Sequence, residues 1–359
     1  MLRIGILTSG GDCQALNAAM RGVIKGLSVK RNDLEIYGFR DGYKGLIYDI
    51  ADRMTPDDFS GILNRGGTIL GTSRTPFKYI NEPDEEGRDK VAGMIKTYKD
   101  LKLDCLVMLG GNGSHKTAAL LSQKGLNVVT LPKTIDNDIE GTEMSFGFQS
   151  AIDVATRTID EIHTTAASHS RVFIVEIMGH KTGWLTLHSG IAGGADIILI
   201  PEIPYNVDEV LNTIRKREKQ GKKFTIIAMA EGAISDEDAK LSKKELKEKR
   251  KTYTFPSVAY QLSDELQKKA GQEVRVTIPG HVQRGGIPSA SDRTLATRIG
   301  VEAAGLILRK DYGNMVCIKD GKFSKIPLEE VAGKTKMVNV DNELIRQAES
   351  LGISLGRKA

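Results

Sequence analysis

The chain of 359 residues has only three cysteines, one tryptophan and 5% aromatic residues. Cys13, Cys105 and Cys317 are far apart, so their spacing indicates neither a disulfide framework nor a zinc site. No segment approaches the roughly 18 uninterrupted apolar residues of a membrane-spanning helix. The N-terminus also lacks the pattern of a signal peptide. We therefore predict a cytoplasmic protein without a membrane partner.

The excess of positive charge is small, because the chain has 51 lysines and arginines and 46 aspartates and glutamates. The most basic stretch, LSKKELKEKRK at 241–251, contains glutamates at helical spacing and no aromatic residue. This pattern is typical of a solvent-exposed helix, and we expect no nucleic-acid partner. Residues 235–252 are predicted to form a charged surface insertion.

Short runs of β-branched residues alternate with amphipathic segments of helical length. The predicted strands are 3–8, 35–39, 104–109, 127–131, 171–177, 196–200, 224–230, 273–278 and 315–318, and the predicted helices include 15–27, 88–102, 145–165, 207–220, 258–270 and 290–309. Apolar strands joined by helical crossovers predict an α/β fold with doubly wound, mainly parallel sheets, and the length suggests roughly two domains. Such sheets bind ligands at the carboxyl ends of their strands.

Two glycine-rich loops follow predicted strands directly, SGGD at 9–12 and GGNGS at 110–114. Glycines allow backbone N–H groups to converge, and a following helix N-terminus favours a phosphate group. A plain tight turn is the alternative for two glycines alone. GGNGSHKT at 110–117 is close to a nucleotide P-loop, but His115 occupies a required glycine position. We find no GxGxxG, so the usual dinucleotide fold is not supported.

The stretch PKTIDNDI at 132–139 places two carboxylates and a lysine at the end of a predicted buried strand. Asp136 could take the proton of a substrate hydroxyl as its oxygen attacks phosphorus. Asp138 could bind Mg²⁺ or its waters, and Lys133 could neutralise charge on the transferring phosphoryl group. A solvent-exposed Asx-type turn is the other interpretation of these residues.

Further along the chain, polar residues suited to an anionic sugar follow other strands. Arg171, Arg275, His281 and Arg284 could converge on a phosphate group, although each arginine alone could form a surface ion pair. Glu231 could accept hydrogen bonds from sugar hydroxyls, or could only cap a helix.

Nine segments together closely resemble 6-phosphofructokinases. They are TSGGDCQALNAAMRG, NRGGTILGTSR, LGGNGS, PKTIDNDIEGT, SHSR, VEIMG, GIAGGAD, AEG and PGHVQRGGIPSASDR, in the family's order between residues 5 and 300. The resemblance implies two doubly wound lobes with the active site in the cleft between them. Residues 1–147 plus 283–333 would form the larger, nucleotide-binding lobe. Residues 148–282 plus 334–359 would form the smaller lobe, which binds the sugar phosphate.

The resemblance also implies a role for individual residues, with Asp136 as the general base that serves the 1-hydroxyl of fructose 6-phosphate. The sugar-binding positions are Thr134, Ile135, Asp136, Arg171, Met178, Gly179, His180, Glu231, Arg275, His281, Val282, Gln283 and Arg284. The nucleotide-binding positions are Gly11, Arg74, Thr75, Gly111, Asn112, Gly113 and Ser114, and Asn112 and Asp138 would hold Mg²⁺.

Arg171 and Arg275 match arginines that reach the sugar phosphate from a neighbouring subunit, so the resemblance implies a homodimer or homotetramer with a shared site. Three positions differ from the usual family pattern. Asn112 replaces a common aspartate, His180 replaces the usual arginine, and His163 replaces an arginine common at the effector site of bacterial allosteric members.

The phosphoryl donor depends on Gly113 and Lys133, which form a mixed signature. Family members that use pyrophosphate typically have aspartate at the position of Gly113 and lysine at the position of Lys133. Members that use ATP typically have glycine at both positions. An aspartate would crowd and repel the α-phosphate of ATP, whereas a lysine does not exclude a nucleotide. We therefore expect ATP as donor. The alternatives are a pyrophosphate-dependent enzyme and, more remotely, a non-catalytic sugar-phosphate sensor.

Overall fold

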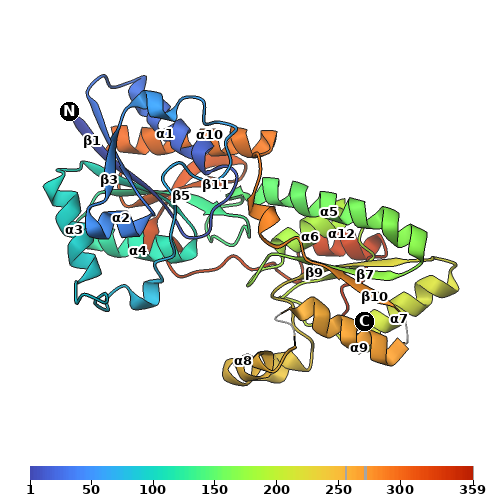
Figure 1. Cartoon of the computed structure of the whole chain (residues 1–359). Helices are drawn as coiled ribbons and strands as arrows, with labels where there is room; N and C mark the ends of the chain where they lie inside the picture. Colours follow the sequence, from blue (N-terminus) through green and yellow to red (C-terminus); the bar gives the residue numbers. More distant parts are fainter. Residues whose placement is uncertain (255–256, 271–272, 359) are drawn as a thin grey trace. The chain divides into compact units, whose positions relative to one another are not determined.

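The computed structural model describes residues 1–254, 257–270 and 273–358, which form two compact units (Figure 1). The first unit consists of Met1–Ser150 and Arg284–Lys336, and the second of Ala151–Gln283 and Met337–Ala359. Each unit therefore combines segments that are distant in the sequence. Among the described residues, no helix has the length and apolar character needed to cross a membrane.

The first unit is built on an eight-stranded sheet with the order β12-β11-β5-β4-β1-β2-β3, and β6 pairs with β5. Its strands are β1 (Leu2–Ser9), β2 (Leu34–Phe39), β3 (Ala51–Met54), β4 (Cys105–Gly110), β5 (Val128–Thr134), β6 (Phe146–Gly147), β11 (Asn314–Lys319) and β12 (Lys322–Pro327). Its helices are α1 (Leu16–Ser28), α2 (Tyr43–Tyr48), α3 (Lys90–Asp100), α4 (Asn112–Gln123), α10 (Ala290–Leu308) and α11 (Leu328–Val331).

The second unit contains a parallel four-stranded sheet with the order β10-β7-β9-β8. Its strands are β7 (Val172–Ile177), β8 (Ile197–Leu199), β9 (Thr225–Ala230) and β10 (Val274–Thr277). Its helices are α6 (Trp184–Ala192), α7 (Val207–Lys219), α8 (Lys243–Lys251), α9 (Val258–Ala270) and α12 (Glu343–Ser350), together with most of α5 (Phe148–His169).

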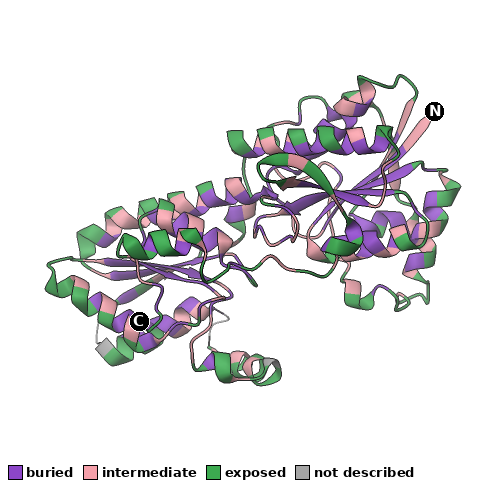
Figure 2. Ribbon diagram, turned by 180° about the vertical axis from the view of Figure 1, so that it is seen from behind, coloured by how far each residue is buried: buried purple, intermediate pink, exposed green. Residues whose placement is uncertain are grey.

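The two sheets confirm the predicted α/β class and the mainly parallel strands. In β4, β7 and β9 all six residues are buried, as expected for strands that helices cover on both faces (Figure 2). The short strands β3 and β12 were not predicted, and both pair antiparallel at the edges of the larger sheet. Edge strands have exposed positions, so they lack the continuous apolar pattern by which the central strands are recognised.

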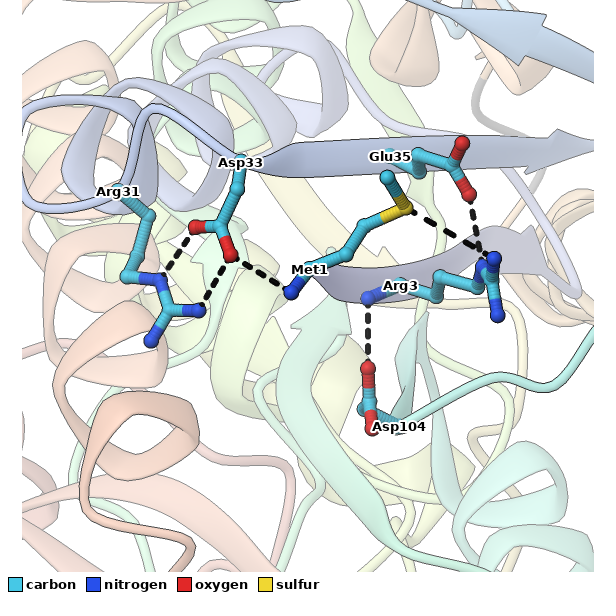
Figure 3. Close-up of polar contacts among 6 residues, drawn as sticks. All are labelled: Met1, Arg3, Arg31, Asp33, Glu35 and Asp104. Carbon is cyan, nitrogen blue, oxygen red and sulfur yellow. Dashed lines mark hydrogen bonds and ion pairs between the residues drawn. The ribbon is translucent and has the colours of Figure 1, made fainter.

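Charged side chains connect the amino ends of β1, β2 and β4 (Figure 3). Arg3 Nε donates to Glu35 Oε2 at 2.7 Å, and the backbone N–H of Arg3 donates to Asp104 Oδ2 at 2.7 Å. Asp33 accepts hydrogen bonds from the Arg31 guanidinium and from the N-terminal ammonium, which lower the pKa of its carboxyl group. Exposed pairs of this kind contribute little stability. The opposite, carboxyl ends of β1 and β4 belong to the candidate site.

Candidate active site

A pocket of about 360 Å³ lies at the carboxyl ends of β1, β4 and β5 in the first unit. Its lining residues come from the loops that follow these three adjacent strands and from two further segments: Ser9, Gly10, Gly11, Asp12, Arg74, Thr75, Pro76, Gly111, Asn112, Gly113, Ser114, Lys133, Thr134, Ile135, Asp136, Asp138 and Arg284. Because parallel strands end at one edge of the sheet, loops that are distant in the sequence meet here. Most of these residues were predicted from the sequence, Ser9, Gly10 and Asp12 only as part of the SGGD loop, whereas Pro76 was not predicted.

The GGNGS loop lies at the start of α4, and Gly111 is the N-cap residue of this helix. The first backbone N–H groups of a helix have no acceptor within the helix, so with the helix dipole they form a binding site for anions. Gly113 lies in this first turn and is exposed, and a β-carbon at this position would meet no atom within 4 Å. The protein itself therefore does not require glycine at position 113.

His115, which breaks the P-loop pattern, is fully buried in α4. Its Nδ1 donates to the carbonyl of Gly111 at 2.9 Å. Burial lowers the pKa of His115 to about 4, so the imidazole is neutral near pH 7. His115 thus has a structural role at the start of the helix.

Lys133 is only 3% exposed, and its ammonium group donates to the carbonyl of Gly11 in the SGGD loop. Burial lowers the pKa of Lys133, and the nearby Arg284 guanidinium lowers it further. The ammonium group therefore fixes the backbone of a glycine loop and also adds positive charge to the pocket.

Asn137 fixes the turn that separates the two aspartates of the TIDND loop. Its φ of +51° lies in the left-handed region, which asparagine adopts more easily than most residues. Its Oδ1 accepts the backbone N–H of Ser145 at 3.0 Å, and Thr134 Oγ1 accepts the backbone N–H of Asp136 at 3.0 Å. This role of Asn137 was not predicted, although asparagine after a strand is a recognisable turn signal.

The same loop is held from two sides at Asp138. Asn112 Nδ2 donates to the backbone oxygen of Asp138 at 3.0 Å and to its Oδ2 at 2.9 Å. The backbone N–H of Lys336 donates to the same backbone oxygen at 2.9 Å. The ammonium of Lys336 donates to the carbonyls of Thr142 and Glu143, each at 2.8 Å. Lys336 was not predicted, because only tertiary structure brings this distant residue to the loop.

The oxygen atoms near Asp138 suit a hard divalent cation. Asn112 Oδ1 is buried and has no hydrogen-bond partner among the described residues, and it belongs to the side chain that binds the Asp138 carboxylate. No group of three or more His, Cys, Asp or Glu side chains suited to a metal occurs in the part of the chain that the structure describes. The oxygen atoms of Asn112 and Asp138 fit Mg²⁺, which takes few protein ligands and retains waters and phosphate oxygens.

Arg284 lies against the SGGD loop. A β-carbon at Gly11 would be only 3.0 Å from Arg284 Nη1, so the guanidinium approaches the backbone closely at a point where glycine leaves room. Arg284 lines the same pocket as Asp136. The structure therefore places this predicted sugar-phosphate residue beside the predicted general base.

Four of the predicted sugar-binding residues follow β7 and β9 in the second unit: Met178, Gly179, His180 and Glu231. The backbone N–H of Gly179 donates to Glu231 Oε1 at 3.4 Å, and that of Met178 donates to Gln283 Oε1 at 3.2 Å. His281 and Val282 lie in a short 3-10 helix at Gly280–Arg284, where Val282 is 66% exposed.

Arg171 and Arg275 lie elsewhere in the same sheet. Arg171 immediately precedes β7, and Arg275 is in β10 opposite Phe173, so both are near the amino end of β7. Both arginines pair with Glu273, with Arg171 Nε 2.5 Å from Glu273 Oε2. At about 3.3 Å per residue, Arg171 is about 20 Å from the carboxyl end of β7. Arg275, opposite Phe173, is about 13 Å from that end, so within one chain both arginines lie away from the strand ends that Glu231 follows.

Taken together, the fold and the pocket define an α/β phosphate-binding protein with a carboxylate among its anion-binding loops, the arrangement needed for phosphoryl transfer. The family profile described as Phosphofructokinase matches residues 3–307. The chain belongs to the phosphofructokinase family.

Named relatives resemble this chain over nearly its whole length. It is 54% identical to the ATP-dependent 6-phosphofructokinase of Spirochaeta thermophila, over 98% of this chain and 97% of the relative. It is 45% identical to ATP-dependent 6-phosphofructokinase 3 of Bacteroides thetaiotaomicron, over 99% of this chain and 100% of that protein.

Solved structures share the fold. Phosphofructokinase from Pichia pastoris in the T-state is 32% identical with a TM-score of 0.79, and the match covers 92% of this chain but only 35% of that longer one. A pyrophosphate-dependent phosphofructokinase from Nitrosospira multiformis has a TM-score of 0.81 at 21% identity, over 98% of this chain and 92% of that one. At that identity, the likeness concerns the fold alone.

Proposed function

We propose that this chain transfers a phosphoryl group from ATP to the 1-hydroxyl of fructose 6-phosphate, giving fructose 1,6-bisphosphate and ADP at the committed step of glycolysis. The observation that carries this function is the position of Asp136, which lines one pocket together with two glycine loops, the N-terminus of α4 and Arg284. The names of the relatives at 54% and 45% identity support ATP as donor.

In this proposal Asp136 acts as general base and takes the proton of the sugar hydroxyl as its oxygen attacks the γ-phosphorus. The backbone N–H groups at the start of α4 and the cations of Lys133 and Arg284 bind phosphate oxygens. Asn112 and Asp138 would hold Mg²⁺, which when bound neutralises phosphate charge. The bonds from Asn112 and Lys336 to the loop keep Asp136 in position.

Glu231, Met178, Gly179 and His180 are the proposed sugar-binding residues of one subunit. Arg171 and Arg275 then serve the sugar phosphate of a second copy, since about 20 Å and about 13 Å of strand separate them from the carboxyl end of β7 in their own chain. The proposed enzyme is therefore a homo-oligomer, a dimer or a tetramer, with subunits that share sugar sites.

A coupled assay that detects fructose 1,6-bisphosphate tests this function with Mg²⁺ and either ATP or pyrophosphate. We expect turnover with ATP. If the protein turns over only with pyrophosphate, it is a pyrophosphate-dependent enzyme and the proposed donor is wrong. Asp136→Asn should lower kcat by about 10²- to 10⁴-fold, the usual contribution of a general base. An undiminished kcat in that variant would refute the role of Asp136. Binding of fructose 6-phosphate without turnover of either donor would support the sensor instead.

A further inference from the structure

The charged insertion at 235–252 is not only a solvent-exposed helix. Its helix α8 lies to one side of the second unit (Figure 1), and Asp238 anchors the segment. Asp238 is 8% exposed, and its carboxylate accepts from Lys249 Nζ at 2.5 Å and from the Tyr253 hydroxyl at 3.3 Å. The backbone N–H of Asp238 donates to Ser235 Oγ at 3.1 Å. These bonds fix the last turn of α8, where Arg250 lies.

A cavity of about 300 Å³ lies between this segment and the carboxyl ends of β7 and β9, and it is lined by Glu176, His180, Glu231, Arg250, Tyr253, Ser257 and Val258. The insertion supplies Arg250, and Tyr253 follows it directly. Glu231 and His180 are two of the proposed sugar-binding residues. The insertion therefore supplies part of the lining of this cavity. The resemblance to phosphofructokinases assigned a role to only some of the lining residues.

Arg250 lines this cavity, and one of its donors is unsatisfied. Its Nε atom is buried and has no hydrogen-bond partner among the described residues. A buried charged donor without an acceptor is unfavourable, so an oxygen atom of a ligand would stabilise this arrangement. Arginine donates from a rigid planar fork and remains charged at any physiological pH.

The other lining groups indicate which part of a sugar phosphate this cavity suits. Glu231 and Glu176 both contribute carboxylates, which would repel a phosphate group. Glu176 already accepts from Ser257 Oγ at 2.6 Å and from the backbone N–H of Ala259 at 3.1 Å. A donor in Arg250 and an acceptor in Glu231 together match hydroxyl groups, because each hydroxyl both donates and accepts.

We propose that Arg250 is a sugar-binding residue supplied by the insertion, which donates to an oxygen of the hydroxylated sugar body while Glu231 accepts from a hydroxyl. This inference rests on the proposed function. It gives the enzyme a guanidinium group in the same cavity as His180, the position where a histidine replaces the arginine usual in the family.

Steady-state kinetics of Arg250→Met and Arg250→Lys test the assignment, with Lys247→Met on an exposed position of α8 as the matched control. Arg250→Met should raise KM for fructose 6-phosphate by about tenfold to a hundredfold, the effect of one hydrogen bond to a charged group. Its KM for ATP should stay at the wild-type value, and its thermal unfolding midpoint should not fall. The KM of Arg250→Lys for fructose 6-phosphate should be intermediate. An unchanged KM for fructose 6-phosphate in Arg250→Met would overturn the assignment.

Calorimetric titration with fructose 6-phosphate and with inorganic phosphate, both without a donor, separates this inference from the proposed function. If Arg250 binds the sugar body, Arg250→Met weakens binding of fructose 6-phosphate and leaves binding of inorganic phosphate unchanged. Equal weakening of both ligands, or of neither, would refute the assignment. A wild-type protein that binds the sugar but transfers no phosphoryl group would refute the proposed function while this comparison still tests Arg250.

Discussion

Replacement of Gly113 by aspartate is the sharpest test of the choice of donor. Position 113 is exposed in the first turn of α4, where an added β-carbon meets no atom within 4 Å. A carboxylate in the first turn of a helix is favourable through the helix dipole. The folded protein should therefore tolerate Gly113→Asp without loss of stability, and any change in ATP use must come from the ligand.

The size of the effect follows from electrostatics. Two like unit charges about 4 Å apart repel by about 1 kcal/mol in water and by about 4 kcal/mol at an effective dielectric constant of 20. At about 1.4 kcal/mol per factor of ten, the affinity for ATP should fall between about fivefold and a thousandfold. Because Gly113 is exposed, screening by solvent and salt favours the lower half of this range.

The assay compares kcat/KM for ATP in Gly113→Asp with that in Gly113→Ala. The alanine variant adds a β-carbon to the same open space without charge, and it should resemble the wild type. Unfolding curves of all three proteins show whether the fold is intact. If the aspartate and alanine variants use ATP equally well, the argument that this position selects the donor is wrong.

Two further predictions concern stability and assembly. His115 is neutral in the folded chain with a pKa of about 4, against 6.5 for an unperturbed imidazole. Above pH 6.5 it therefore adds no pH dependence, whereas between pH 6.5 and 4 only the unfolded chain gains its proton, so the free energy of unfolding should fall by about 3 kcal/mol. Denaturant titrations from pH 6.5 to 4 should show this fall in the free energy of unfolding of the wild type and not of His115→Gln. The prediction is wrong if the free energies of both proteins fall equally over this range. For assembly, Asp136→Asn and Arg171→Ala are each expected to be nearly inactive. Co-expression should restore activity through mixed oligomers, because some sites then combine an intact base with an intact partner arginine; no recovery in isolated mixed oligomers would contradict a shared site.

Much of the fold could be predicted from the sequence, because buried parallel strands require nearly continuous apolar residues. The six fully buried residues of β4 and of β9 are such runs, and the SGGD, GGNGS and TIDND segments directly follow predicted strands. A parallel sheet brings the ends of its strands to one edge, so this order in the sequence already indicates one phosphate-binding edge.

Long-range contacts could not be predicted in this way, since neither periodicity nor local spacing records them. Lys133 binds the carbonyl of Gly11, and the backbone N–H of Lys336 binds the carbonyl of Asp138 in the loop that carries Asp136, across more than a hundred residues of sequence. Likewise, 235–252 has the composition of a solvated helix, and only its packing through Asp238 brings Arg250 to the cavity of Glu231. The central strands, most of the long helices and the chemistry of each loop could thus be predicted from residue types, whereas only the folded chain shows which charges meet, because burial and distance set their energies.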